Sequence, residues 1–268
     1  MPKITHKTYF TKRNKYLSNS KVGDFNKSKA YFKRKHILGK VEKKESPALL
    51  LGSMVDTYLT EGPAKFRQLF VPVARRSLKN PPTGYTEVTQ AVYDQGLAIA
   101  TKVASTKAFK DLKKYKKQVI LQHDIKDFSQ FPGIAGMLDF LLVDMKNKKA
   151  HIRDLKTSKT ADMRKYFWHA IGFGYHRQMA MYGWLVSETF GIPRENITYG
   201  HLVVEKDPDA IYKVVTFMFD TAFITTCMDK LKEKVYQIDA ETRWLDDEVT
   251  WENAYIINEK GSYEQPTN

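Results

Sequence analysis

The stretch 133–143 most constrains the fold of this chain, because it is an apolar run of strand length that contains a single acid, Asp139. After a charged turn, the segment 151–157 carries Asp154 and Lys156 two positions apart. Side chains alternate along a strand, so these two residues point to the same face, about 6–7 Å apart. An unpaired acid within an apolar strand is costly, and a metal ion is its obvious partner. An acid followed one strand later by Asp-x-Lys is typical of a Mg²⁺-dependent phosphodiesterase site.

The composition indicates a globular protein. The chain has 268 residues, of which 42% are hydrophobic and 13% aromatic, enough for one large domain or one domain with extensions. No segment approaches the roughly 18–20 apolar residues that a membrane helix needs. The first residues lack the apolar core of a signal peptide. We therefore expect a cytoplasmic protein with no membrane partner.

Cysteine content and motif content exclude several classes of site. The single cysteine, Cys227, excludes an intrachain disulfide, a multi-cysteine zinc site and an iron–sulfur cluster held by one chain. No phosphate-binding loop of the Gly-x-x-x-x-Gly-Lys-Ser/Thr type is present in the sequence. We therefore expect no ATP and no iron–sulfur cluster among the cofactors.

The charge is large and unevenly distributed. The formal net charge is +14, and residues 1–44 hold 14 Lys and Arg against two acids, a net charge of +12. Residues 239–268 hold eight acids against two basic residues, a net charge of −6. A basic arm on a globular protein predicts a polyanionic partner, most often nucleic acid, with solubility alone as the alternative. The acidic tail is either a solvated end or a segment that folds back on the basic arm.

Apolar periodicity and capping residues predict an alternating order of helices and strands. Residues 1–45 read as short helices, and residues 66–90 as largely loop. The predicted helices cover residues 46–60, 86–114, 161–190 and 220–245, and the predicted strands cover residues 118–125, 133–143, 149–157, 196–206 and 211–219. This order favours a central mixed β-sheet with helices on its faces.

A second motif follows the first. Gln178 and Tyr182 are four residues apart and share one face of the predicted helix. Together with Asp139 and the Asp154-x-Lys156 element, they form an order in which the chain resembles the PD-(D/E)xK nuclease superfamily. Within it, the chain is most similar to the exonuclease VIII (RecE-type) group of phage recombination nucleases, related to lambda exonuclease and to RecB-like nuclease domains. The resemblance spans roughly residues 15–240.

The chain departs from the pattern of that group at two positions. Asp56 stands where relatives carry a histidine on the first helix, and Gln118 stands where they often carry a glutamate. An aspartate oxygen is well suited to a hard cation such as Mg²⁺. The departures therefore concern the number of metal ions and the rate more than the fold.

The resemblance implies a restriction-endonuclease-like α/β core in residues 46–245, preceded by a basic helical extension (1–45) and followed by an acidic tail (246–268). It implies a Mg²⁺ site, which Mn²⁺ would also fill. The implied ligands are Asp139, Asp154, the backbone carbonyl of Leu155 and Asp56. Lys156 would orient the attacking water and stabilise developing charge. Gln178 and Tyr182 would contact DNA or support the site. The alternatives are a core Tyr182 with an exposed Gln178, and a structural role for Asp56.

The implied activity is ATP-independent exonuclease digestion of linear double-stranded DNA, 5′ to 3′, which leaves a 3′ single strand for an annealing protein. Relatives act as rings, so a homo-oligomer is a further expectation. Basic residues that we expect to contact the DNA backbone are Arg75, Arg76, Lys116 and Lys117. Two alternatives remain open: a weak or inactive DNA-binding or assembly protein on a nuclease scaffold, and an endonuclease or single-strand nuclease that uses the same residues.

Overall fold

A computed structural model of the chain describes residues 4–11, 14–41, 46–73, 84–207, 209 and 211–242, together with the backbone of two short strands, β8 (Ile256–Ile257) and β9 (Tyr263–Glu264). Arg75 and Arg76, which we expect to contact DNA, lie outside the described residues. Most of the acidic tail also lies outside them.

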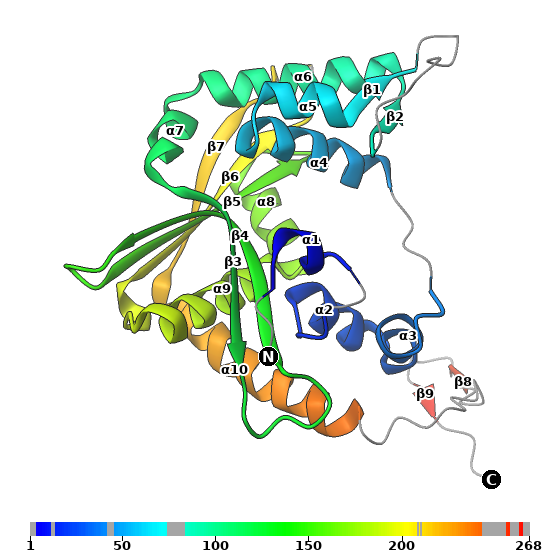
Figure 1. The fold of residues 1–268 in the computed structure, drawn as a ribbon, viewed down its shortest axis with the longest axis vertical. Helices are drawn as coiled ribbons and strands as arrows, with labels where there is room; N and C mark the ends of the chain where they lie inside the picture. Colours follow the sequence, from blue (N-terminus) through cyan, green and yellow to red (C-terminus); the bar gives the residue numbers. More distant parts are fainter. Residues whose placement is uncertain are drawn as a thin grey trace.

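A five-stranded mixed sheet forms the centre of the fold, with the strand order β3-β4-β5-β6-β7 (Figure 1). Its strands are β3 (Lys116–Asp124), β4 (Gly133–Asp144), β5 (Lys149–Ser158), β6 (Ile197–Glu205) and β7 (Val214–Phe219). All neighbours are antiparallel except β5 and β6, which run parallel. A parallel pair needs a long crossover, and two helices between β5 and β6 provide it. The predicted α/β fold with a central mixed sheet is confirmed.

Helices cover both faces of this sheet. Figure 1 shows α4 (Pro47–Thr60) and α6 (Gln90–Ser105) above it, and α9 (Tyr175–Phe190) and α10 (Thr221–Thr242) below it. Each pair of helices buries its own hydrophobic cluster against the strands. The other helices are α1 (His6–Tyr9), α2 (Asn19–Lys27), α3 (Lys29–Phe32), α5 (Pro63–Leu69), α7 (Lys107–Lys110) and α8 (Met163–Gly172), with the single turns η1 (Lys33–Ile37), η2 (Asp111–Lys114) and η3 (Arg194–Asn196).

Capping residues fix the start of two of these helices. The side chain of Ser46 accepts a hydrogen bond from the amide of Leu49 at 3.3 Å, with Pro47 in the first turn of α4. Asp220 accepts a hydrogen bond from the amide of Phe223 at 2.8 Å, at the start of α10. Both helices therefore begin where the sequence predicts.

Three regions differ from the prediction. The helix predicted over 86–114 is shorter, because residues Thr86–Val88 form a strand and α6 ends at Ser105, before the separate turns α7 and η2. Residues 66–90 are not simply loop, because α5 reaches Leu69 and a small parallel pair forms between β1 (Phe70–Pro72) and β2 (Thr86–Val88). The predicted single helix over 161–190 is two helices, α8 and α9. The break falls at Gly174, whose φ of 70° lies in the left-handed region that glycine tolerates. The break lets α9 start in a new direction.

Part of the basic N-terminal region joins the main core. Leu17 donates its amide hydrogen to the carbonyl of Gly133 at 2.8 Å and accepts one from Ala135 at 2.9 Å, alongside the start of β4. Leu17, Val22 and Phe25 are buried in the same cluster as α9 and α10. This packing ties the N-terminal helices to the sheet that carries the predicted acids.

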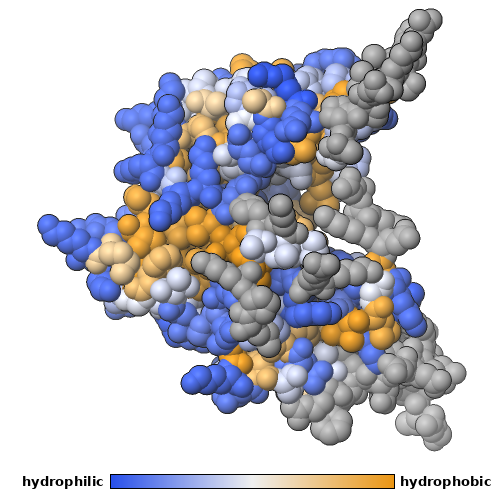
Figure 2. Space-filling view, viewed as in Figure 1, coloured by the Kyte–Doolittle hydropathy of each residue, from blue (hydrophilic) through white to orange (hydrophobic). Residues whose placement is uncertain are grey.

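The surface view shows how polarity is distributed. Hydrophilic residues dominate the edges of the molecule in Figure 2, and hydrophobic residues gather at its middle, over the strands of the sheet. Within the described parts of the chain, no helix combines the length and apolar character that crossing a bilayer requires.

One carboxylate of α10 holds the loop between β3 and β4. Asp239 is 5% exposed, and its oxygens accept the amide hydrogens of Ser129, Gln130 and Phe131 at 2.8–3.0 Å. Removing this buried acceptor takes away three backbone hydrogen bonds at once, so we expect Asp239→Ala to lower the free energy of unfolding by about 2–4 kcal/mol in urea titrations.

The matched control is Asp229→Ala on the same helix. Asp229 forms an exposed ion pair with Arg194 at 2.6 Å, and such pairs contribute about 0–1 kcal/mol. Equal losses in the two variants would contradict the anchoring role of Asp239.

Candidate active site

A break in the regular pairing of β4 lies at Asp139. Leu138 and Leu141, three positions apart, both pack in the cluster of α9 and α10, whereas Phe140 packs in the cluster of α4. The alternation of side chains therefore shifts by one residue at Asp139. The β3–β4 register pairs the residues on both sides of this point but omits the pair of Gln118 with Asp139. Gln118 has a φ of 48°, a left-handed conformation that re-aims side chains as β-bulges do.

The carboxylate of Asp139 takes the place of a backbone carbonyl of β4 as the acceptor for an amide of β5. The amide of Leu155 donates to Oδ2 of Asp139 at 2.8 Å, beyond the point where the β4–β5 pairing stops, at Phe140 and Arg153. The N–H and C=O groups of one strand residue point to the same neighbour. The carbonyl of Leu155 therefore points to the side on which Asp139 lies, as the ligand prediction for Leu155 requires.

Asp154 lies on the adjacent strand and is 1% exposed. The ammonium group of Lys156 contacts its Oδ2, and the side-chain amide of Gln178 donates to its Oδ1 at 3.4 Å. The structure therefore brings Asp154 and Lys156 to one face of β5, as their spacing predicts.

Asp56 approaches the same region from α4. Its Oδ2 accepts a hydrogen bond from the side-chain amide of Gln118 at 3.2 Å, and the same amide donates to the hydroxyl of Thr60 at 2.8 Å. The other oxygen of Asp56, Oδ1, is buried and has no hydrogen-bond partner among the described residues. The two residues that depart from the family pattern thus bind each other.

Two of the carboxylates, Asp139 and Asp56, have raised pKa values. Burial raises the pKa of Asp139 well above its usual range, and the negative charges of Asp154 and Asp56 add to this effect. Burial and the charge of Asp154 raise the pKa of Asp56 to about 6. Burial alone would lower the pKa of Lys156, but the charges of Asp154 and Asp139 outweigh it, so the pKa is raised. The site therefore holds more negative charge than Lys156 alone compensates.

The donor set fits a hard divalent cation. No three His, Cys, Asp or Glu side chains in the described parts of the chain stand close enough together to form a ready-made metal cluster. Mg²⁺ does not need such a cluster, because it usually keeps several waters and takes one or two carboxylates with substrate phosphates. Asp139, Asp154 and the carbonyl of Leu155 supply oxygen atoms of this kind. The unpartnered buried oxygen of Asp56 is a further candidate ligand.

Gln178 and Tyr182 form a relay from Asp154 to β4. The side-chain amide of Gln178 donates to the hydroxyl of Tyr182 at 2.7 Å, and this hydroxyl donates to the carbonyl of Met137 at 2.7 Å. Tyr182 is also a core residue, 6% exposed. A Cβ at Gly136 would come within 2.9 Å of the Tyr182 ring, so glycine there leaves room for the tyrosine.

Two further residues at the site carry no clear sequence signal. The ammonium of Lys156 lies 4.6 Å from the ring centroid of Tyr175. Tyr175 precedes Gln178 by three residues, and that helical spacing is the only pointer to it. His201 is fully buried opposite Asp154 in the β5–β6 register and contacts the hydroxyl of Tyr166 at 2.7 Å. Burial, together with the charge of Lys156, lowers the pKa of His201 well below its usual range.

Lys116 and Lys117 lie exposed at the start of the edge strand β3. The ammonium of Lys117 donates to the carbonyl of Leu59 at the end of α4 at 2.7 Å. A cation at a helix C-terminus is favourable by itself. DNA contact by these lysines stays a prediction.

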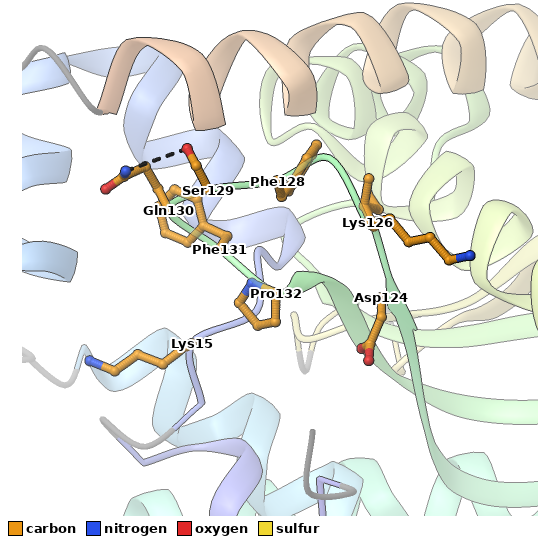
Figure 3. Close-up of a pocket in the computed structure, with 9 residues that line it drawn as sticks. Lys15, Asp124, Lys126, Phe128, Ser129, Gln130, Phe131 and Pro132 are labelled. Carbon is orange, nitrogen blue, oxygen red and sulfur yellow. Dashed lines mark hydrogen bonds between the residues drawn. The ribbon is translucent and has the colours of Figure 1, made fainter.

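A groove of about 440 Å³ lies elsewhere, between Lys15 and the loop that joins β3 to β4 (Figure 3). None of the predicted site residues lines it. Asp239 already accepts the amide hydrogens of three loop residues, and Tyr16 donates to Asp124 at 2.5 Å. The groove is thus separate from the carboxylates, and its loop amides are engaged.

The chain matches a known protein family over most of its length. Residues 18–244 match the model of a family described as a PDDEXK-like domain of unknown function. A comparison with curated proteins finds no significant match.

Solved structures share the fold. A candidate exonuclease from Eubacterium rectale is 19% identical, covers 90% of this chain and 88% of its own, and superposes with a TM-score of 0.66. At this identity the likeness concerns the fold alone. A phage related exonuclease from Haemophilus somnus is 15% identical and covers 86% of this chain and 96% of its own. Its TM-score of 0.35 is too low to support a structural argument.

The raised pKa of Asp56 predicts a pH-dependent stability in the absence of metal. The folded state holds this proton more tightly than the unfolded chain does, because the pKa rises from 3.8 to about 6. The resulting stabilisation is complete below pH 4 and is lost as the pH rises through 6. We expect the free energy of unfolding to fall by about 1–3 kcal/mol over this window, and to fall less in Asp56→Asn.

Denaturant titrations in EDTA between pH 4 and 7.5 measure this effect. The control is Asp94→Asn, an exposed substitution on α6, which should leave the slope unchanged. Identical slopes for the wild type and Asp56→Asn would show that the folded state does not raise the pKa of Asp56.

Proposed function

Because this chain belongs to the PDDEXK-like family whose model it matches, we propose that it is a nuclease that hydrolyses DNA phosphodiester bonds with Mg²⁺. The observation that carries the proposal is the placement of Asp139 against the backbone of Leu155, beside Asp154 and Lys156. Within a sheet that buries mainly apolar residues, this arrangement of charges is costly unless a cation and a phosphate use it.

Asp139, Asp154 and the carbonyl of Leu155 would hold the metal ion, with Asp56 as an additional ligand from α4. A bound Mg²⁺ supplies Lewis-acid activation of the phosphate and of a water molecule, and stabilises the leaving oxygen. Mn²⁺ provides the same oxygen-based chemistry and should substitute for it.

Lys156 acts as a cation and not as a base. Its raised pKa keeps the ammonium protonated at neutral pH, so it has no free lone pair to accept a proton. It can donate hydrogen bonds to the attacking water and to the phosphate oxygens on which charge develops. Its contact with Asp154 keeps it on the face of β5 where the carboxylates lie.

Gln178 orients Asp154, and Tyr182 orients Gln178. One amide of Gln178 donates both to Asp154, at 3.4 Å, and to Tyr182, at 2.7 Å. Tyr182 is fixed in turn by the carbonyl of Met137. Because the hydrogen bond from Gln178 holds Oδ1 of Asp154, the orientation of its other oxygen, Oδ2, is also defined.

The finer proposal is an ATP-independent exonuclease that digests linear double-stranded DNA 5′ to 3′ and leaves a 3′ single strand for an annealing protein. The resemblance of the site motifs to the exonuclease VIII group supports it, as does the strongly basic N-terminal region. A homo-oligomeric ring is the assembly that this resemblance favours.

A non-catalytic DNA-binding protein on the same scaffold is the second candidate, and Asp56 and Gln118 are the observations that favour it. Against it, Asp139, Asp154 and Lys156 are all present and adjacent, although DNA binding alone needs none of them. An endonuclease or single-strand nuclease with the same residues is a third candidate.

Digestion of linear duplex DNA with Mg²⁺ and without ATP tests the proposal. The DNA carries separate labels at each 5′ end and at an internal position, and closed circular DNA runs alongside. We expect loss of linear DNA only, and a rate at least about 100-fold lower in Lys156→Ala, because a donor to developing charge contributes about that much.

Lys159→Ala is the matched control, since Lys159 is an exposed lysine just after β5. It should retain near-normal digestion. Cleavage of the closed circle would replace the exonuclease by an endonuclease. Retained DNA binding with no digestion under Mg²⁺ or Mn²⁺ would favour the non-catalytic candidate.

A further inference from the structure

An exposed phenylalanine lies at the corner between α8 and α9. The side chain of Phe173 is 66% exposed. Its amide donates to the carbonyl of His169 at 2.9 Å, and the next amide, of Gly174, donates to Ile171 at 3.0 Å. These bonds fix the backbone on both sides of the ring. An ordered turn therefore presents the Phe173 ring to solvent.

The ring of Phe173 continues a line of contacts that starts at Lys156. It stacks on the ring of Tyr175 with the centroids 5.7 Å apart and the planes 26° from parallel. The ammonium of Lys156 lies 4.6 Å from the centroid of the same tyrosine. Phe173 is therefore no more than about 10 Å from the cation that we assign to the phosphate.

We propose that Phe173 and Tyr175 form a stacking subsite for an unpaired nucleobase of the strand being cut, within a few nucleotides of the phosphate at Lys156. The proposal deepens the proposed function and rests on it, because the strand must enter at Lys156. Tyr175 forms the inner end of the subsite and Phe173 its solvent-exposed end.

The distances suit a nucleic acid strand. Successive phosphates of one B-form strand lie about 3.4 Å apart along the helix axis, and an unpaired strand is more extended, so about 10 Å corresponds to roughly one to three nucleotides. A base attached near the phosphate at Lys156 can therefore reach Phe173. The near-parallel stack of the two rings is also the arrangement that a further flat ring extends.

The chemistry of the corner also suits a base. Aromatic side chains stack on every base because each base has a π-face, which gives binding without sequence preference. Arg164 and Lys165 lie exposed on α8, which ends next to Phe173, and can contact the backbone phosphates. The same helix exposes Met163, Phe167 and Trp168, so a second copy of the chain is the other occupant that a test must separate.

The test is a double-mutant cycle between the protein and the DNA. The substrate is a short duplex with a frayed end, in which each of the first four positions of the frayed strand is made abasic in turn. Binding to the full chain is measured by fluorescence anisotropy with Ca²⁺ in place of Mg²⁺. We expect Phe173→Ala to weaken binding of the intact substrate about 5- to 150-fold.

The cycle identifies the base that stacks. With the substrate that is abasic at one particular position, Phe173→Ala should lower the binding affinity by less than a further factor of about two, because the wild-type ring has no base to stack on there. Phe173→Trp should restore the intact affinity. Trp168→Ala is the matched control, since Trp168 is exposed to a similar degree, 69%, and its ring contact is with Phe167. It should bind within about twofold of the wild type.

Three outcomes would overturn the proposal. The first is a loss in Phe173→Ala that is the same with intact DNA and with every abasic strand. The second is an equal loss in Trp168→Ala. The third is unchanged DNA binding in Phe173→Ala, accompanied by a lower oligomeric state in analytical ultracentrifugation, which would assign this corner to a second copy.

Failure of the proposed function is separable from failure of the subsite. If the double-mutant cycle shows coupling between Phe173 and one base but the protein cuts no DNA, the stacking subsite stands and the proposed hydrolysis is rejected. If the cycle shows no coupling but DNA digestion depends on Lys156, only the stacking subsite is rejected.

Discussion

The hydrogen bond from the amide of Leu155 to the carboxylate of Asp139 is the contact on which the candidate site depends. It forms where the pairing of β4 with β5 ends and where β4 changes the face to which its side chains point. Without that shift, Asp139 would not lie beside Asp154. The same break leaves the carbonyl of Leu155 available on the side of the two acids. Opposite the break, Gln118 adopts a left-handed conformation, and its side chain reaches Asp56 on α4. One irregularity in the sheet thus brings together residues from α4, β3, β4 and β5.

Electrostatics explain why this arrangement calls for a ligand. Burial and mutual repulsion raise the pKa of Asp139 and of Asp56, and one oxygen of Asp56 is buried without a partner among the described residues. Lys156 neutralises part of this charge through its ion pair with Asp154. The same ammonium group also makes a cation–π contact with the ring of Tyr175. A divalent cation would offset the remaining repulsion, and a phosphate would then match the combined charge of the cation and Lys156. The pH-dependent stability expected without metal and the phosphodiester chemistry proposed with metal would both follow from this cluster.

Local signals in the sequence predict much of this fold and part of the site. Ser46 and Pro47 mark the start of α4, and the alternation around Asp154 and Lys156 places both on one face of β5. Contacts between segments that are far apart in the sequence are harder to predict. Gln118 adopts a left-handed backbone conformation, for which a glycine would have been the usual sequence signal. His201 lies opposite Asp154 only because of the β5–β6 register. Leu17 joins β4 through backbone hydrogen bonds, which no side chain announces. The sequence predicts loop over residues 66–90, because the prolines and basic residues there mask the end of α5 and the β1–β2 pair.

The most direct test of this account is an anomalous difference map from crystals of the protein soaked in Mn²⁺. The account predicts a peak between Asp139 and Asp154, within coordination distance of the carbonyl of Leu155, that disappears in Asp139→Asn. Mn²⁺ accepts the same oxygen ligands as Mg²⁺, so the peak reports the site that the catalytic ion would occupy. A map with no peak there, or a peak that survives Asp139→Asn unchanged, would contradict the claim that these carboxylates form a metal-dependent phosphodiesterase centre.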